Sequence, residues 1–237
     1  MWVAGVLLWT GSAVHSGRAQ SQQTAAAANL DERGAYTISL HGRPIGTEKF
    51  SIRSVPEGIE ASADIQLRVS QQGRNIALKS NTQLLMNSRF EPQTYSVRQS
   101  GSPDFNLLVD FRSSPATSKL HASGQAEDDT RTIVLSKDVA ILDDNVIHHY
   151  QILVDRFALK PEKRQTFAAY IPQEATPGTL TLEQLGKEEI NLPGGKRTLT
   201  HLVMKTELVQ IHLWLDDENR LQRLYNPSQE IEAIRKK

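Results

Sequence analysis

Two pairs of histidines come closest to a chemical site in this sequence. His148 and His149 are adjacent within a stretch that has helical periodicity. Neighbouring residues on a helix point about 100° apart, so this pair cannot chelate one metal ion as histidines at i and i+4 would. His149 borders the apolar side and is expected to be partly buried, whereas His148 is expected to be exposed. A structural role is therefore predicted for both.

His201 and His212 lie on the two strands of one predicted hairpin. If its turn centres on Lys205-Thr206, Gln210 lies opposite His201 and Leu199 lies opposite His212, which makes the two histidines diagonal cross-strand neighbours. With no third residue at zinc-ligand spacing, no metal site is predicted. A chemical role would need a carboxylate or a third histidine beside them. A hydrolase that uses His201 or His212 is therefore the least favoured function.

Other catalytic patterns are absent from the sequence. The acidic clusters fall in predicted turns or at a helix start, where water solvates them, whereas a paired-carboxylate hydrolase needs two carboxyls at a fixed gap inside a cleft. These clusters are Asp128-Asp129, Asp143-Asp144 and Asp216-Asp217-Glu218. There is no Gly-x-Ser-x-Gly elbow, no EF-hand spacing and no cysteine, which excludes thiol catalysis and disulfides. We predict a non-enzymatic protein without metal or cofactor.

One amphipathic helix is predicted at about residues 144–160. Large apolar residues recur there at helical spacing and form one apolar stripe. They are Val146, Tyr150, Leu153, Val154 and Phe157. Asp143 or Asp144 is expected to cap the N-terminus of the helix, and Pro161 is expected to end it.

The rest of the chain has the alternating pattern of strands. Apolar and polar residues alternate most clearly from Ile59 to Val69, and short turns separate the alternating runs. Short connections favour antiparallel pairing. The sequence predicts a mostly β fold: a curved antiparallel sheet or open barrel of about ten to twelve strands around the helix. Residues 34–227 form a single domain, between a disordered leader at 20–33 and a polar tail at 228–237.

The N-terminal region resembles a signal peptide. The apolar run Trp2–Trp9 is too short to span a bilayer, and small residues precede a cleavage site before Gln20; a cut within Ala25–Ala28 is the alternative. No Lys or Arg precedes the run, which counts against export. We expect residues 1–19 to be removed, leaving a periplasmic or secreted protein with no stable transmembrane segment. The 27 basic and 27 acidic residues balance, so nucleic acid is not an expected partner.

Two blocks of sequence carry a resemblance. The opening block contains Tyr36, Ile38, Leu40, Gly42, Ile45, Gly46, Thr47, Glu48 and Phe50, and the closing block runs from Leu213-Trp214-Leu215-Asp216 to Arg220-Leu221. Together they resemble an uncharacterised family of exported bacterial all-β proteins, a domain of unknown function. The resemblance implies a curved sheet around one helix, by analogy with envelope lipid-carrier half-barrels, and it implies no catalytic residue.

The helix face decides between two functional hypotheses. If the sheet closes tightly on the helix, its apolar residues are core and nothing more. If the sheet is splayed, they line a groove for a lipid or another apolar small molecule, which is the first hypothesis. The expected ligand-binding residues are Val146, Tyr150, Leu153, Phe157 and Trp214. The alternative is a structural or interaction protein of the cell envelope, whose exposed strand edges pair with an envelope protein.

Overall fold

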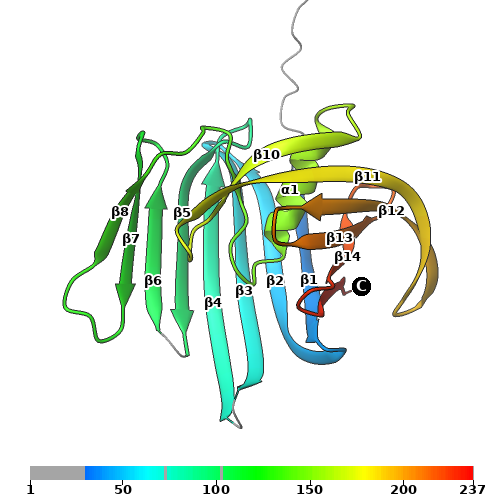
Figure 1. The fold of residues 1–237 in the computed structure, drawn as a ribbon, viewed down its shortest axis with the longest axis horizontal. Coiled ribbons are helices and arrows are strands. Elements are labelled where there is room, and N and C mark those ends of the chain that lie inside the picture. The colour runs from blue at the N-terminus through cyan, green and yellow to red at the C-terminus, as the bar shows by residue number, and fades with distance from the viewer. Residues whose placement is uncertain (1–29, 72–73, 102–103, 237) are drawn as a thin grey trace, which may run out of the picture.

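The computed structural model describes residues 30–71, 74–101 and 104–236, in which one 15-stranded sheet curves around one helix (Figure 1). The strands run in the order β8-β7-β6-β5-β4-β3-β2-β1-β15-β14-β13-β12-β11-β10-β9, so β8 and β9 are the two edges of an open sheet. All neighbours pair antiparallel except β9 and β10, which are parallel. A mostly β, curved and open sheet around one helix is therefore confirmed.

The elements have the following bounds. The first eight strands are β1 (Asp31–Leu40), β2 (Arg43–Val55), β3 (Gly58–Gln71), β4 (Arg74–Met86), β5 (Pro92–Ser100), β6 (Phe105–Asp110), β7 (Ala116–Ala122) and β8 (Asp129–Ile133). They are followed by β9 (Ala140–Ile141), the helix α1 (His148–Ala158), β10 (Arg164–Ile171), β11 (Thr176–Leu192), β12 (Gly195–Lys205), β13 (Gln210–Leu215), β14 (Leu221–Asn226) and β15 (Ile231–Arg235).

The predicted number of ten to twelve strands is too low. The strand β9 has two residues, which is too short for any periodic signal. The prediction of a polar tail is wrong for Ile231–Arg235, because this segment is β15 and pairs with both β1 and β14. The predicted leader extends too far, since β1 begins at Asp31. The predicted signal peptide and the rest of the leader up to residue 29 lie outside the described residues.

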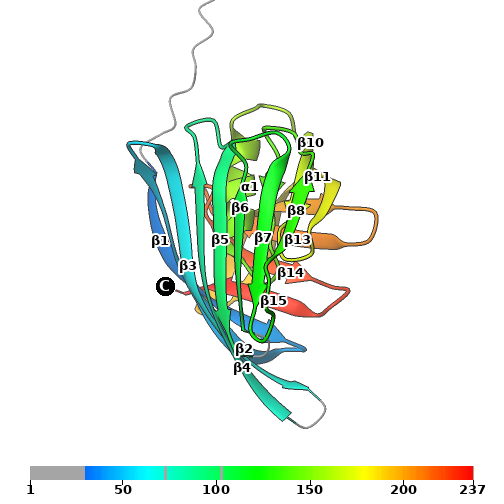
Figure 2. The same cartoon turned by 90° about the vertical axis from the view of Figure 1, so that its left-hand side faces the viewer.

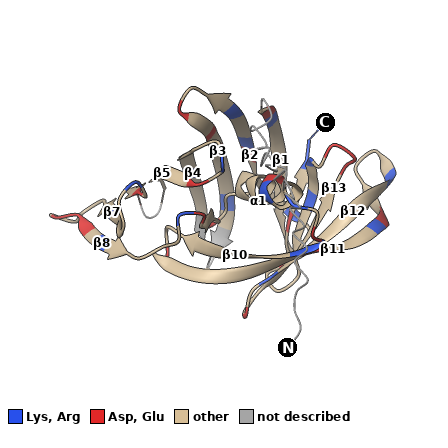
Figure 3. Ribbon diagram, turned by 90° about the horizontal axis from the view of Figure 1, so that it is seen from above, with Lys and Arg blue, Asp and Glu red and all other residues tan. Residues whose placement is uncertain are grey.

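The strands β1–β4 and β10–β15 enclose the helix, as the view from above shows (Figure 3). The strand β5 contacts the start of the helix through Tyr95, and β6–β8 continue the sheet beyond it as a wing, whose strands stand side by side in Figure 2. The alternation of side chains along each strand decides which face of the sheet packs against the helix. On β3, Ile59, Ala61 and Ile65 are buried toward the helix, whereas Ser62 and Asp64 lie on the opposite face. The two faces of the sheet therefore have different chemistry.

The helix begins later than predicted and is capped from another strand. Its N-cap is Ile147, which makes no side-chain cap, so the prediction of Asp143 or Asp144 as the cap is wrong. The carboxylate of Glu48 on β2 instead accepts hydrogen bonds from the amides of Ile147 (2.6 Å) and His148 (2.7 Å). This anion lies where the helix dipole favours negative charge.

The predicted exposure of His148 is also wrong. Its side chain is completely buried, as is most of Gln151 on the expected polar side. Because the sheet surrounds the helix, the side of α1 that the sequence marks as polar is covered as well. Those buried polar groups then need partners inside the protein, and α1 finds several of them on the sheet.

Candidate functional site

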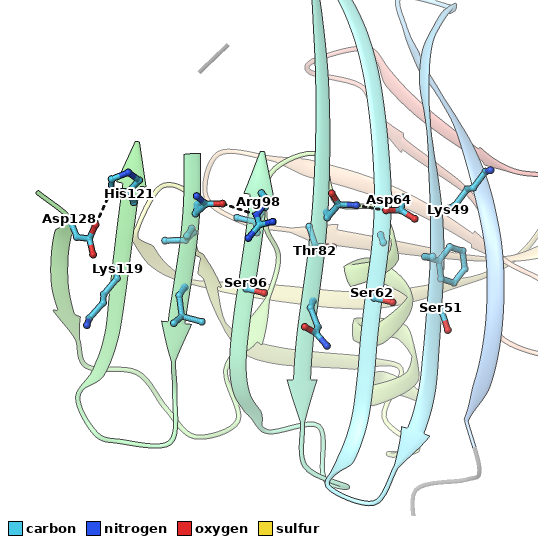
Figure 4. A pocket seen from close by; sticks show the side chains of 18 residues that line it. Lys49, Ser51, Ser62, Asp64, Thr82, Ser96, Arg98, Lys119, His121 and Asp128 are labelled. Carbon is cyan, nitrogen blue, oxygen red and sulfur yellow. Dashed lines mark hydrogen bonds and ion pairs between the residues drawn. The ribbon is translucent and has the colours of Figure 1, made fainter. Parts of the chain in front are cut away.

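A large hollow lies on the face of the sheet that turns away from the helix (Figure 4). It is an open groove of about 850 Å³ that crosses the strands from β2 to β7 and reaches the segment before β8. Figure 4 shows its side chains standing on these strands, with the helix behind the sheet. At about 4.8 Å between strands, six strands give the groove a length of about 24 Å.

Two rows of side chains form the walls of the groove, and strand pairing sets each row. The first row is Lys49, Asp64, Asn81, Arg98, Asn106 and His121, each opposite the next on the neighbouring strand. The second row is Ser51, Ser62, Gln83, Ser96, Leu108 and Lys119. Between them lie Phe50, Ala63, Thr82, Val97 and Leu107, which also line the groove and belong to the opposite face of the strands. Backbone therefore forms much of the floor.

The first row is bound together by polar contacts between neighbouring strands. Asn81 donates to Asp64, and Arg98 Nε donates to the side-chain oxygen of Asn106 at 3.1 Å. At the end of the row, His121 Nδ1 lies 3.0 Å from the carboxylate of Asp128. These contacts hold a line of fixed donors and acceptors along one wall.

The charges of the groove are only partly compensated within it. Lys49 and Lys119 form no ion pair with any residue of the described ranges, and Arg98 meets an amide rather than a carboxylate. The second wall is low, because serines make up half of it. The groove can therefore hold an elongated polar molecule by hydrogen bonds and by contacts with cations.

The predicted apolar site is packed with side chains. Val146, Leu153 and Phe157 are buried in the main core, and Tyr150 is half-buried against the same core. The cavity that borders Leu153 has a volume of about 10 Å³, roughly the space of one water molecule. An acyl chain would enter here only if α1 separated from the sheet, and the lipid hypothesis stays a prediction for that conformation.

Trp214 lies apart from the helix residues with which it was grouped. It packs with Ile190 and Leu199 in a second, small cluster on the other face of the sheet. Trp214 Nε1 donates to Glu188 at 2.9 Å, and the guanidinium of Arg223 lies 4.7 Å from the ring centre. The structure therefore brings together four of the five predicted ligand-binding residues and leaves Trp214 outside.

A buried polar network holds the N-terminal end of the helix. Besides its two amide contacts, Glu48 lies 3.0 Å from His148 Nδ1. His149 Nδ1 accepts from the amide of Asp143 at 3.1 Å, and the Asp143 carboxylate accepts from the Tyr95 hydroxyl at 2.6 Å. Burial and the neighbouring His148 lower the pKa of His149 well below its usual value, and burial raises the pKa of Asp143. The predicted structural role of both histidines agrees with these contacts.

The other histidine pair has the carboxylate neighbour that the sequence did not reveal. His201 Nε2 and His212 Nδ1 lie 2.9 Å apart, and His201 Nδ1 lies 2.9 Å from Glu188. The pairing differs from the predicted register, because His201 lies opposite Trp214 and His212 lies opposite Val203. The turn is longer than two residues, but the predicted diagonal relation of the histidines holds.

Two further features are absent from the part of the chain that the structure describes. Within the described residues, no group of three or more His, Asp or Glu side chains could hold a metal ion. No described helix has both the length and the apolar character needed to cross a membrane.

Sequence reasoning did not find the groove. Its signal was the run of outward-facing polar residues on successive strands, such as Ser62 on β3 and Ser96 on β5. In an antiparallel sheet such residues indicate only a solvated face. Whether such a face is hollowed depends on the three-dimensional arrangement of several strands, which no local pattern records.

Comparisons with known proteins agree with the fold. No curated protein matches the chain. A crystal structure of a β-barrel-like DUF1849 protein from Brucella abortus has a TM-score of 0.60 at 9% identity, over 90% of this chain and 98% of that one. A DUF1089 family protein from Pseudomonas aeruginosa has a TM-score of 0.45 at 11% identity, over 74% and 87% of the two chains. Residues 35–227 match the model of DUF3108, a protein of unknown function, and the expected resemblance to an uncharacterised family is thereby confirmed. The chain belongs to the DUF3108 family of proteins of unknown function.

Proposed function

We propose that this protein is an exported, non-enzymatic binding protein that holds an elongated polar ligand in the groove across β2–β7. The observation that carries the proposal is the pair of side-chain rows that lines about 850 Å³ of open space. The rows supply amide, hydroxyl, carboxylate and cationic groups at the spacing of the strands. Pockets that combine convergent polar groups with a fixed framework are typical ligand sites.

The rigidity of the sheet supports this assignment. Every groove residue except Asp128 stands on a strand that is paired on both sides between β2 and β7, and the core on the opposite face fixes those strands. A site on rigid strands needs little ordering when a ligand binds, which favours affinity. Export rests on the apolar run Trp2–Trp9 and would place the groove in the periplasm or outside the cell.

A steric block of the groove tests the proposal. Ser62 stands near the middle of the second wall and is half-buried, so Ser62→Trp fills the groove without entering the core. Thr198→Trp is the matched control, since Thr198 is an exposed hydroxyl residue on β12. Native mass spectrometry of protein purified from its own cells should find a polar ligand on the wild type and on Thr198→Trp, and none on Ser62→Trp. A lipid retained equally by all three would overturn the polar groove and favour the apolar site beside α1.

An interaction role in the cell envelope is the second candidate, and one observation favours it. Among the described strands, β8 pairs with β7 alone, so one side of β8 is open for another strand. Crosslinking in the envelope followed by mass spectrometry should then recover a partner joined near residues 129–133. Recovery of uncrosslinked monomer alone would count against this role. A hydrolase using His201 and His212 remains the third alternative, and loss of a measured hydrolysis in both His→Ala variants would be its test.

A further inference from the structure

His201 and His212 bring two imidazole nitrogens together on the surface of the sheet. His201 Nδ1 donates to the carboxylate of Glu188, so the Nε2 of a neutral His201 carries the lone pair. That lone pair points at His212 Nδ1, 2.9 Å away. Two imidazole nitrogens thus meet at one point on the outer face of β12 and β13.

We propose that His201 Nε2 and His212 Nδ1 bind one divalent copper or nickel ion, with water in the remaining coordination positions. The site lies on the opposite arm of the sheet from the groove and does not depend on the function proposed for it. The His201 side chain is 14% exposed and its partner is half-buried, so solvent reaches the pair. Gln210, which contacts His212, is exposed as well.

The spacing of the two nitrogens, which a hydrogen bond sets in the absence of metal, is compatible with coordination of copper(II) or nickel(II). Imidazole nitrogens bind these metals at about 2.05 Å, and two such bonds at a right angle place the nitrogens about 2.9 Å apart. The tetrahedral angle of zinc would require about 3.3 Å between them. The observed 2.9 Å therefore fits neighbouring positions of a square-planar or tetragonal ion. Copper(II) is also the strongest binder in the general affinity order of the divalent metals.

A second shell of contacts holds the first ligand in place. Glu188 accepts from His201 on one side and from Trp214 Nε1, at 2.9 Å, on the other. A carboxylate on the far nitrogen of a histidine fixes its tautomer and raises its strength as a metal ligand. The ring of Trp214 stacks on that of His201 with 4.8 Å between centres and 12° between planes, which restricts its rotation.

The nearby positive charges are compensated by other residues. Arg223 forms a 2.6 Å ion pair with Glu232, and Lys205 lies 3.8 Å from Glu183. The carboxylate of Glu188 therefore sets the sign of the electrostatic potential around His201 and His212, and that sign is negative.

Binding changes the proton position of the second histidine. Without metal, the proton on His212 Nδ1 is donated to His201, and its Nε2 accepts from the amide of Gln210 at 2.9 Å. With metal on Nδ1, that proton moves to Nε2, and the side-chain amide of Gln210 turns to present its oxygen. No bond outside these three side chains has to break.

Titration of the full chain with Cu²⁺ alone tests the proposal. Calorimetry gives the dissociation constant, and quenching of tryptophan fluorescence reports on Trp214 beside the ion. We expect His201→Asn and His212→Asn to weaken the copper site at least tenfold, and Glu188→Gln to weaken it about tenfold as a positioning residue. His41→Asn is the matched control, because His41 also contacts a surface carboxylate, that of Glu230, and lies outside both the groove and the histidine pair. That variant should bind copper like the wild type.

Two results would overturn the site. One is an unchanged copper affinity in both His201→Asn and His212→Asn, which would place bound copper on other groups. The second comes from the wild type alone and needs no folded variant. Copper bound at the pair broadens the NMR ring signals of His201 and His212 before those of His41 and His121, and its electron paramagnetic resonance spectrum shows two coupled nitrogens. Equal broadening of all four histidines would mean adventitious copper.

Discussion

The carboxylate of Glu48 on β2 holds His148 at the first turn of α1 by both its backbone amide and its ring. The two contacts measure 2.7 Å and 3.0 Å, and the amide of Ile147 adds a third at 2.6 Å. The ring of Phe50, two residues further along β2, lies parallel to that of His148. The family-like segment around Glu48 therefore docks the helix onto the sheet, which explains why a buried carboxylate is present in an apolar core.

Removing the charge of Glu48 should weaken the protein strongly. Glu48→Gln keeps the shape but replaces one acceptor oxygen with an amide donor that faces the donors of α1. Hydrogen bonds to charged groups contribute about 1.5–3 kcal/mol each, and a mismatched buried partner costs more than a lost one. We expect the free energy of unfolding to fall by about 2–4 kcal/mol in urea titrations. Glu57→Gln, in the exposed turn between β2 and β3, should change it by less than about 0.5 kcal/mol. Equal values for the two variants would show that the buried charge is not what stabilises the helix.

Burial of His149 should make stability depend on pH. Its folded pKa lies well below the ordinary value of about 6.5 that applies when the chain unfolds. Below about pH 6.5 the unfolded chain therefore binds a proton that the folded chain refuses. The stabilising contribution is complete above that pH and is lost as the pH falls, by up to about 1.4 kcal/mol per pH unit.

The measurement compares His149→Gln with His41→Gln. Glutamine at 149 keeps an acceptor for the Asp143 amide and cannot be protonated. The free energy of unfolding should therefore change less steeply between pH 6.5 and 5, by up to the slope that the binding of one proton gives. His41 lies in the exposed turn between β1 and β2 and serves as the control. An unaltered slope in His149→Gln would mean that another group governs acid stability.

Local patterns predicted the strands because each strand has one buried face. The run from Ile59 to Val69 is an example, and its alternation matches the burial seen in β3 as far as Leu67. Patterns failed where a distant residue decides the outcome. The cap of α1 comes from Glu48, about 100 residues away in the sequence. No local pattern points to Glu48, so the sequence predicted Asp143 or Asp144, which lie nearer to the helix. The strand β15 depends on its pairing with β1, near the other end of the described chain, and its five residues are too short a run for a clear alternation.

The candidate sites show the same division. The diagonal relation of His201 and His212 follows from residue spacing in a hairpin, but Glu188 joins them from β11 through a register that contains a bulge between Gln184 and Gly186. Spacing alone does not give such a register. The groove is harder still, since it depends on the arrangement of six strands and not on any one of them.

The packing of Phe157 distinguishes a solid core from an apolar ligand site. Its side chain is 7% exposed and belongs to the main core, so Phe157→Ala should lower the free energy of unfolding by about 3–5 kcal/mol. Leu159→Ala is the control, because Leu159 is 54% exposed just after the same helix. Chemical denaturation of both variants gives the comparison. A loss below about 1 kcal/mol at Phe157, together with a lost apolar ligand, would favour a helix that opens.

Asp155 on α1 should give the stability of the protein a pH dependence opposite in sign to that of His149. Burial raises the pKa of Asp155 from 3.8 to about 7, and one of its carboxylate oxygens has no partner among the described residues. The folded chain therefore holds a proton that the unfolded chain releases above pH 3.8, so stability falls as the pH rises from about 4 to 7. Asp155→Asn mimics the protonated form and should gain on the wild type across that range, by on the order of 1 kcal/mol because the side chain is partly exposed. Asp31→Asn, at an exposed position, is the control. A constant difference between Asp155→Asn and the wild type from pH 4 to 8 would rule out proton uptake at this carboxyl.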